Sequence, residues 1–440
     1  MRHESSIKVL GTEVRRGTAV RGPARTVTAT AALTVLLGLG SVPVALADGS
    51  PAPSASPSQA IPTGLYGSDD PAEDGVRRQS LTLLALSTAG EKPPAEAVRW
   101  LVDQQCDNGA WAAYRADPYA KCDATTPVDP GSTAVAVQAL AWLGRHDTEI
   151  ERAVDWLKDV QHEDGGWGDD AGGASDAGST SAVIGALAAV GADPADQKRH
   201  GNSPYDLLGT LSVPCQEKGA GAFAQRPDKK GGLVPDAEAT AAGVLGSLGK
   251  GYVVGAWMAG DKADGCRSDS GGREAVAHNG VRRLTEATAE NGCLTSALSG
   301  SGGRPDHGAT ADAVVALAAA GATDATSKPL AWLKKNHGSW AAEAGPAAYA
   351  RLILAAHATW TDPHDFGGTD LVEQLAATGP ATDVDYFPTP DGNTSAGEEG
   401  QAEDDSGFGW SGKWLLARLG VFAAISLFVF FVWDRKRDRS

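Results

Sequence analysis

The apolar residues of this chain gather in runs of helical length that have no polar face. These runs are rich in Ala, Val and Leu, and most of them end at a glycine, such as Gly144 or Gly191. A helix that is apolar on every side is buried on every side, so we expect these runs in the interior of the fold. The predicted interior helices are Val76–Ala89, Ser132–Leu143, Ser179–Val190, Glu238–Leu248, Ala309–Ala320 and Pro346–Ala358.

Amphipathic runs alternate with these apolar runs. In the run at 149–161, Ala153, Val154 and Leu157 form one apolar stripe, and charged residues occupy the other side. The predicted amphipathic helices are Pro94–Gln105, Glu149–Gln161, Ser203–Ser212, Val276–Asn291, Pro329–Asn336 and Thr369–Ala377. Six helices of each kind predict an all-α fold, an α/α toroid of about six helix pairs with the apolar helices as its inner ring. The segment Lys250–Arg273 breaks the alternation and is predicted to be an inserted lobe or a small hairpin.

Two of the connections carry the same motif, Q-x-x-x-G-x-W. It reads Gln105, Gly109 and Trp111 in one copy and Gln161, Gly165 and Trp167 in the other. Such a 56-residue recurrence is typical of a repeat architecture. We interpret the Gln as a clamp on the backbone, the Gly as the residue of a tight turn and the Trp as a cover over the joint between repeats. Two degenerate copies are predicted at Gln216…Phe223 and at Gly338-Ser-Trp340, where Lys334 replaces the Gln.

Four of the predicted inner helices begin at an aspartate: Asp129, Asp176, Asp236 and Asp306. A carboxylate there caps the free N–H groups of the first turn. The same helix starts would also surround one mouth of the ring, where they could touch a ligand. The residues that we predict to line this mouth flank the helix starts; they are Trp111, Tyr114, Tyr119, Asp129, Trp167, Asp176 and Phe223.

The two ends of the chain have the composition of targeting segments. Residues 1–47 resemble a signal peptide that ends at Ala45-Leu46-Ala47, and 48–64 form a Pro/Ser/Ala-rich linker. Residues 65–379 are the predicted toroid, and 380–412 are an acidic tether without apolar runs. Residues 413–434 are long and apolar enough to cross a membrane, and the basic tail 435–440 then faces the cytoplasm. The predicted location is a cell membrane with a single span and the body outside.

Charge and cysteine usage narrow the function classes. Residues 48–412 hold 26 basic and 51 acidic residues, a net charge of −25, which argues against nucleic acid as a partner. An exported chain can form disulfides, and Cys106 and Cys122, which flank the first motif, are the predicted pair. Cys215, Cys266 and Cys293 leave one thiol whose identity the sequence does not decide.

The motif gives the chain a family resemblance. Q-x-x-x-G-x-W resembles the repeat signature of the squalene/terpenoid cyclase and prenyltransferase superfamily, with two intact copies and two degenerate ones over residues 65–379. The resemblance implies an α/α toroid. It does not imply one chemistry, because the superfamily includes terpene cyclases, protein prenyltransferases, complement-type thioester domains and cobalamin-binding α-domains.

None of these catalytic signatures is present in the sequence. Cyclases protonate an alkene with D-x-D-D, and the nearest string here, at 383–386, lacks the last acid and lies in the predicted tether. A chamber for carbocations needs several aromatic faces, and the chain has eight Phe and seven Tyr. The Asp–Cys–His grouping of a prenyltransferase zinc site and the Gly-Cys-Gly-Glu-Gln thioester string are also missing. The sequence therefore predicts no metal and no cofactor, and it favours a non-catalytic role while leaving catalysis open.

The sequence predicts a membrane-tethered extracytoplasmic toroid that binds a small-molecule ligand. The resemblance to cobalamin-binding domains suggests a corrinoid-like nutrient, handed to a membrane transporter. Because the second, ligand-closing domain of that branch has no counterpart here, a partner protein would have to supply it. Two alternatives remain open: an exported terpenoid cyclase-like enzyme that acts on a polyprenyl lipid, and a cell-surface scaffold that binds protein or peptide.

Overall fold

The computed structural model describes residues 62–67, 71–115, 117, 120–255, 264–268, 272–296 and 303–380. The chain divides into two units, 1–60 and 61–440, and every described residue belongs to the second. The predicted signal peptide, membrane span and basic tail lie outside the described residues, as does nearly all of the predicted linker and tether. Among the residues that are described, no helix is both long and apolar enough to span a membrane.

Six buried helices form the interior of the fold. They are α1 (Pro71–Thr88), α3 (Pro130–Leu143), α5 (Ala177–Ala189), α7 (Ala237–Ser247), α9 (His307–Ala319) and α11 (Pro346–Ala358). Each of them packs against the next one in this order, and α11 packs against α1, so the series of contacts closes on itself. Most residues of α3, α5 and α9 are buried, and many of them are alanines. Such small side chains allow the helices to pack closely on several sides.

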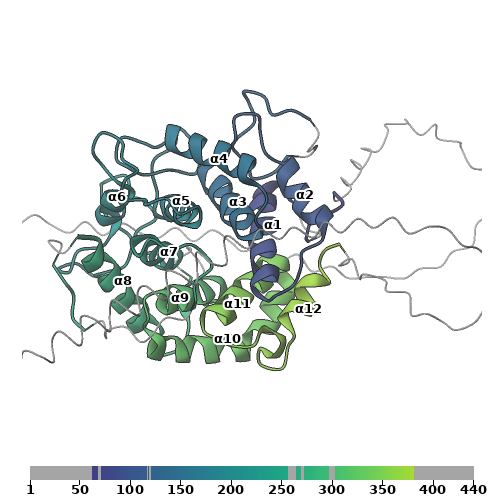
Figure 1. The fold of residues 1–440 in the computed structure, drawn as a ribbon. Coiled ribbons are helices and arrows are strands. Elements are labelled where there is room, and N and C mark those ends of the chain that lie inside the picture. Colours follow the sequence, from purple (N-terminus) through teal and green to yellow (C-terminus); the bar gives the residue numbers. More distant parts are fainter. Residues whose placement is uncertain are drawn as a thin grey trace, which may run out of the picture. The chain divides into compact units, whose positions relative to one another are not determined.

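Six further helices lie at the periphery of Figure 1, each on the outer side of the buried set. They are α2 (Ala95–Asp103), α4 (Asp147–Asp159), α6 (Pro204–Leu211), α8 (Gly272–Thr288), α10 (Thr323–Ala344) and α12 (Leu371–Ala376). Each is amphipathic as the pattern predicts; α4, for example, buries Ala153, Val154 and Leu157 and exposes its charged residues. A short 3-10 turn, η2 (Pro363–Asp365), precedes α12.

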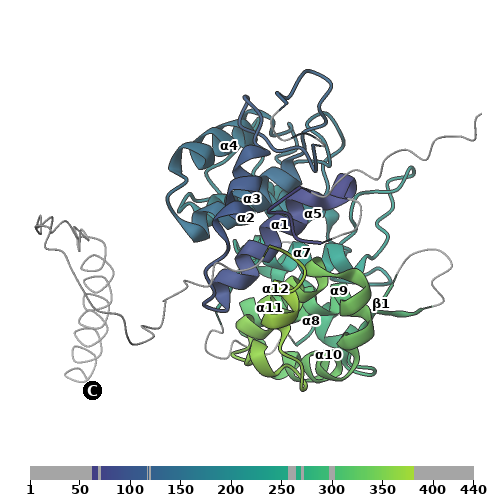
Figure 2. The ribbon, with the colours of Figure 1, turned by 90° about the vertical axis from the view of Figure 1, so that its right-hand side faces the viewer.

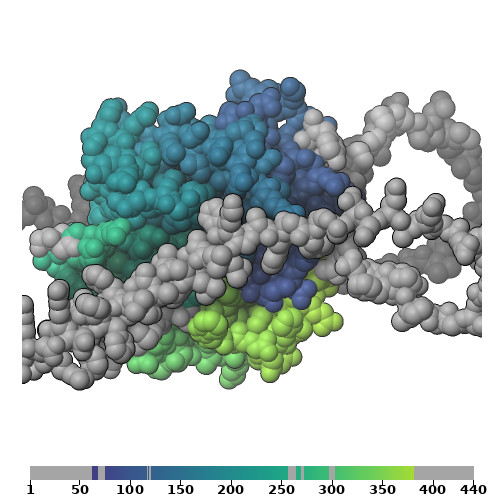
Figure 3. Space-filling model, viewed as in Figure 1, coloured from purple at the N-terminus to yellow at the C-terminus, as the bar shows by residue number. Residues whose placement is uncertain are grey.

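The prediction of an all-α fold is confirmed for the described residues. Apart from isolated bridges, the only strands among them are β1 (Leu294–Thr295) and β2 (Pro305–Asp306). These two-residue strands form an antiparallel pair beside the start of α9. Figure 2 shows α1 to α5 together in one half of the molecule and α9 to α12 in the other, with β1 at the edge next to α9. The space-filling view shows the same division, with early segments in blue and teal and late segments in green (Figure 3).

The helix α10 corrects one prediction. Gly338-Ser-Trp340 was expected to be a degenerate connecting loop, but it lies within α10, a helix of 22 residues. The Trp340 ring stacks on His307 at the start of α9, with 5.2 Å between the ring centroids. This contact stabilises the helical path, in which a Gly-Ser pair is tolerated.

The chain closes the helix series by joining its two described ends. The amide of Gly67, just before α1, donates a 2.9 Å hydrogen bond to the carbonyl of Thr378, just after α12. Gly379 lies against the ring of Tyr66, where a Cβ would be 2.1 Å from a ring carbon.

Candidate functional site

The two intact motifs form the joints between consecutive repeats. Trp111 and Trp167 are completely buried, and their indole N–H groups donate to the carbonyls of Leu101 and Leu157, 2.8 and 2.7 Å away. Their backbone amides donate to the hydroxyls of Thr133 and Thr180 in the first turn of the next buried helix (2.9 and 3.1 Å). Each Trp thereby links the preceding outer helix to the following inner one.

The Gly and Gln of each motif fix the loop against the next outer helix. Gly109 and Gly165 have φ of +93° and +90°, and a Cβ on either would lie 2.3 Å from a carbonyl oxygen, that of Arg152 or Ser203. The Gln105 side chain donates to the carbonyls of Gly109 (2.9 Å) and Glu149 (2.8 Å). Gln161 donates in the same way to Gly165 (2.8 Å). These contacts are those of an architectural motif.

The same joint recurs at three positions where the sequence no longer matches the complete motif. The backbone amides of Tyr66, Phe223 and Leu294 donate to Gln79, Thr240 and Thr310, each at 3.0 Å. A glycine with positive φ stands two residues before each: Gly64, Gly221 and Gly292. The copy at 292–294 was missed in the sequence because both Gln and Trp are replaced. Its remaining signal is a Gly two residues before an apolar residue, followed by the D-x-x-x-T string that opens α9.

The candidate site is a cavity of about 440 Å³ at the starts of the inner helices. All six inner helices contribute to its wall, mostly from their first or second turn. The lining side chains with polar atoms are Arg77, Asp129, Ser132, Asp169, Ser179, Gln225, Glu238, Tyr252, Asp312 and Arg351. The cavity is therefore the point where otherwise apolar helices carry their charges.

Arg351 of α11 connects two acids of the cavity. Its guanidinium lies 3.4 Å from Glu238 of α7 and 3.8 Å from Asp312 of α9. Asp312 and, to a smaller extent, Glu238 raise the pKa of Arg351 above its ordinary value. The ion pairs join three inner helices across the cavity wall, with Glu238 on the more solvent-exposed side.

Arg77 of α1 has a different environment. Its guanidinium donates a 2.8 Å hydrogen bond to the Tyr252 hydroxyl and lies over the same ring, 5.8 Å from the centroid. Among the described residues, no carboxylate forms an ion pair with it. Arg77 is thus a cation of the cavity wall whose hydrogen-bond partner is the hydroxyl of Tyr252, and the more distant Asp312 and Glu238 also raise its pKa.

The segment that follows α7 contributes Tyr252 to the cavity wall. Gln138 of α3 accepts from the Tyr252 amide (3.0 Å) and donates to the carbonyl of Ala182 on α5 (3.0 Å). Gly251 packs on Gly185 so closely that a Cβ on the latter would be 2.8 Å from the Gly251 Cα. The described part of the predicted lobe or hairpin therefore begins as an inward segment between inner helices, and this places Tyr252 in the cavity.

Asp176, the cap of α5, lies behind the wall and has no exposed side-chain surface. Its carboxylate accepts from the amide of Ser179 (2.8 Å) and the side chain of Gln225 (2.9 Å), and the guanidinium of Arg226 is 3.6 Å away. Burial, together with the neighbouring Asp169, raises the pKa of Asp176 to about 6. Arg226 also pairs with Asp169, so both acids share one cation.

The cavity contains only part of the predicted mouth. Asp129 lines it, and Asp176 lies directly behind it. Trp111, Trp167 and Phe223, which we predicted to line the mouth, are completely buried, because the joints need their rings and amides. Tyr114 packs half-buried against the core and is not among the lining residues, and Tyr119 lies outside the described residues.

The charges of the candidate site were not predicted from the sequence. Asp312 and Arg351 are single charged residues early in α9 and α11, and Glu238 opens α7. A lone charge in an otherwise apolar helix would have been the signal, since it needs a polar partner or a cavity. The described residues contain no group of three or more His, Cys, Asp or Glu arranged to hold a metal ion.

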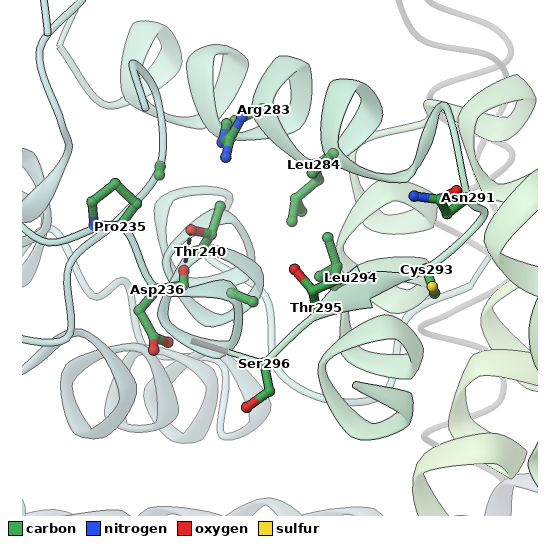
Figure 4. A pocket seen from close by; sticks show the side chains of 13 residues that line it. Pro235, Asp236, Thr240, Arg283, Leu284, Asn291, Cys293, Leu294, Thr295 and Ser296 are labelled. Atoms are coloured by element: carbon green, nitrogen blue, oxygen red, sulfur yellow. Dashed lines mark hydrogen bonds between the residues drawn. The ribbon is translucent and has the colours of Figure 1, made fainter. Parts of the chain in front are cut away.

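A second cavity, of about 330 Å³, lies between the start of α7, α8 and β1 (Figure 4). Arg283, Asn291, Cys293 and Thr295 are among its lining residues. Cys293 is a free, buried thiol, and burial raises its pKa. The Thr240 hydroxyl in this wall is engaged in the joint to Phe223, so this cavity borders a structural connection.

The other cysteines form two disulfides. Cys106 is bonded to Cys122, the pair that the sequence suggested. Cys215 is bonded to Cys266, which ties the segment after α7 to the loop after α6. Two cross-links in one domain are typical of an oxidising compartment.

Comparison with known proteins gives a distant relationship. No family model matches the sequence. A segment is 33% identical over 89 residues to squalene–hopene cyclase of Zymomonas mobilis, and it spans 18% of this chain and 14% of the cyclase. Among solved structures, a protein from Actinoplanes aligns with a TM-score of 0.44 and 15% identity, over 69% of this chain and 96% of that one. The sequence similarity is therefore to a terpenoid cyclase over a short segment.

Proposed function

We propose that residues 62–380 form an α/α toroid of the terpenoid-cyclase type, which captures a small polar ligand without catalysis. The closed series of inner-helix contacts and the short similarity to squalene–hopene cyclase support the toroid. The observation that carries the function is the cavity itself. All six inner helices direct polar side chains into one space of about 440 Å³, which lies within the range of small-molecule sites.

The lining disfavours a polyprenyl cyclase. A cationic terpenoid intermediate needs aromatic faces, and Tyr252 is the one aromatic residue among the described lining residues. The segment that carries Tyr252 also packs against α3 and α5, through Gln138 and Gly185. Glu238 and Asp312 at the wall form ion pairs with Arg351, although burial raises the pKa of Glu238 above its ordinary value.

The size of the cavity also limits the ligand. A whole corrinoid is too large to enter a space of about 440 Å³ and would rest on its rim, so we favour a smaller polar nutrient over the corrinoid. We retain the proposal of a single C-terminal span at 413–434 with the body outside, which would hold the cavity near a membrane transporter. Labelling of cysteines introduced at either end of the span, in intact cells, tests this topology.

Native mass spectrometry of the full chain, purified in detergent, tests the capture function. We expect the wild type to retain a polar species of a few hundred daltons and the Glu238→Gln/Arg351→Met variant to lose it. Glu373→Gln, an exposed change in α12, is the matched control and should retain the ligand. Retention of a polyprenyl lipid would favour the enzyme instead, and retention of nothing by any form would favour the scaffold.

A further inference from the structure

The two arginines of the cavity differ in the charges around them. Arg351 forms ion pairs with both Glu238 and Asp312. A third arginine, Arg226, which lies behind the wall, forms ion pairs with both Asp169 and Asp176. Each of these groups of three carries one more negative charge than positive when all are ionised. Asp129 adds a further carboxylate to the wall. The carboxylates in and behind the cavity wall therefore outnumber the arginines that pair with them.

Arg77 presents the opposite situation. A guanidinium has five N–H donors in a planar fork, and the hydrogen bond of Arg77 to the Tyr252 hydroxyl uses one of its three nitrogens. That hydroxyl is fixed in turn, because the Tyr252 backbone is held by Gln138. Arg77 is therefore oriented by Tyr252 and makes no direct ion pair among the described residues, although Asp312 and Glu238 interact with it over a longer distance. Its fork suits a carboxylate in a bidentate arrangement.

We propose, on the basis of the capture function above, that the ligand is a compact zwitterion. Its anionic group binds Arg77, and its basic nitrogen lies toward Glu238, Asp312 and Asp129. Charges withdrawn from water are costly unless they are paired, and a ligand with both signs can pair with Arg77 and with the excess of carboxylates at once. The volume suits a molecule of the size of a basic amino acid. Tyr252 and Gln138 act as positioning residues for Arg77.

Isothermal titration of the full chain with matched probes tests this proposal. L-arginine and L-lysine carry the carboxylate and the basic side chain, whereas agmatine and cadaverine keep the bases and lack the carboxylate. We expect the amino acids to bind at least about 10-fold more tightly than the amines, as for the loss of a charged hydrogen bond. Arg77→Met should abolish this preference, and Arg77→Lys should restore part of it, because the charge remains without the fork.

Arg283→Met provides the matched control, since Arg283 lines the second cavity and should leave the preference unchanged. Tyr252→Phe removes the hydroxyl that orients Arg77 and should reduce the preference for the carboxylate more than the affinity for the amines. Circular dichroism of each variant excludes misfolding as the reason for a loss.

The outcomes separate the two proposals. The zwitterion proposal is overturned if the amines bind as well as the amino acids, or if Arg77→Met keeps the preference. It is also overturned, with capture intact, if native mass spectrometry finds a neutral or purely anionic ligand that depends on Glu238 and Arg351. If no probe binds and no native ligand is retained, both proposals fail.

Discussion

Two joints of the same fold show which parts of the repeat are indispensable. At the joint before α5, Gln161, Gly165 and Trp167 are all present, and the Trp amide donates to Thr180 at 3.1 Å. At the joint before α9, Leu294 replaces the Trp and no Gln is present, yet its amide donates to Thr310 at 3.0 Å. A positive-φ glycine occupies the same position in both, Gly165 at +90° and Gly292 at +72°.

The comparison separates the signature from the geometry. In the first joint the Trp indole donates a hydrogen bond to the preceding helix, and the Gln side chain donates one to the backbone of the loop. The second joint forms without either hydrogen bond. The glycine and the threonine occur in both, because the turn requires the left-handed conformation and the buried amide requires an acceptor. A repeat can therefore lose the Gln and Trp of the motif and still form the same joint.

Truncation of the apolar residue should give the largest difference between the joints. Trp167→Ala removes a fully buried indole and its hydrogen bond and should lower the free energy of unfolding by about 4 kcal/mol. Leu294→Ala removes a smaller side chain at the edge of the second cavity and should cost about 2 kcal/mol. Urea denaturation followed by circular dichroism measures both. Equal losses would mean that the indole adds nothing to the first joint.

Substitution of the glycines probes the close approach of the backbone. A Cβ at Gly165 would be 2.3 Å from the Ser203 carbonyl oxygen, whereas at Gly292 the nearest atoms are 3.1 and 3.2 Å away. We expect Gly165→Ala to cost about 3 kcal/mol and Gly292→Ala about 1.5 kcal/mol, since only the conformational strain is common to both. Thermal unfolding compares the two variants, with Gly209→Ala, in open space within α6, as the control. The interpretation is wrong if the order is reversed.

Removal of the threonine hydroxyl should affect both joints alike. Thr180→Val and Thr310→Val each leave a buried backbone amide without its acceptor, at an expected cost of about 2 kcal/mol. Thr148→Val, at an exposed position of α4, should change stability little. Hydrogen exchange of the Trp167 and Leu294 amides gives a local measurement. A large loss at only one joint would contradict the equivalence of the two bonds.

A dependence on pH is expected at the intact joint. The raised pKa of Asp176, about 6, means that the folded state holds this proton where the unfolded chain, with a pKa near 4, has released it. The contribution of Asp176 to the free energy of unfolding therefore falls as pH rises from about 4 to 6 and is constant above. Asp176→Asn keeps the helix cap and should remove this slope.

Unfolding in urea at pH 4.5 and pH 7 measures the slope, and Asp155→Asn, at an exposed position of α4, serves as the control. A variant whose stability changes with pH as steeply as that of the wild type would show that another group is responsible.

Most of the helical pattern could be predicted from the sequence. The inner helices were predictable because burial on all sides leaves an unambiguous apolar pattern. The predicted run Pro346–Ala358 coincides with α11, and the other predicted inner helices differ from the observed ones only at their ends. The error at α10 has a tertiary cause. The contact of Trp340 with His307, 33 residues away, keeps a Gly-Ser pair helical, and no local pattern reveals that contact.

The cavity was harder to predict for a related reason. The aspartates at helix starts indicated the correct end of the inner helices, and Asp129 does line the cavity. The aromatic residues beside them belong to the joints, since a Trp in a tight connection is more useful as packing than as a wall. Arg77 and Tyr252 are 175 residues apart, and the inward path that brings them together follows from the contact of Gly251 with Gly185.

The bond between Gly67 and Thr378 has a consequence for engineering. Because the first and last described segments meet, a short peptide could join them, and new termini could be opened in the loop after α5, near the exposed Asp193 and Asp196. Such a circularly permuted chain would keep every pair of neighbouring helices and change only the order in which they are synthesised. It would place a reporter domain on the side of the molecule between α5 and α6, at a point where no inner helix is interrupted.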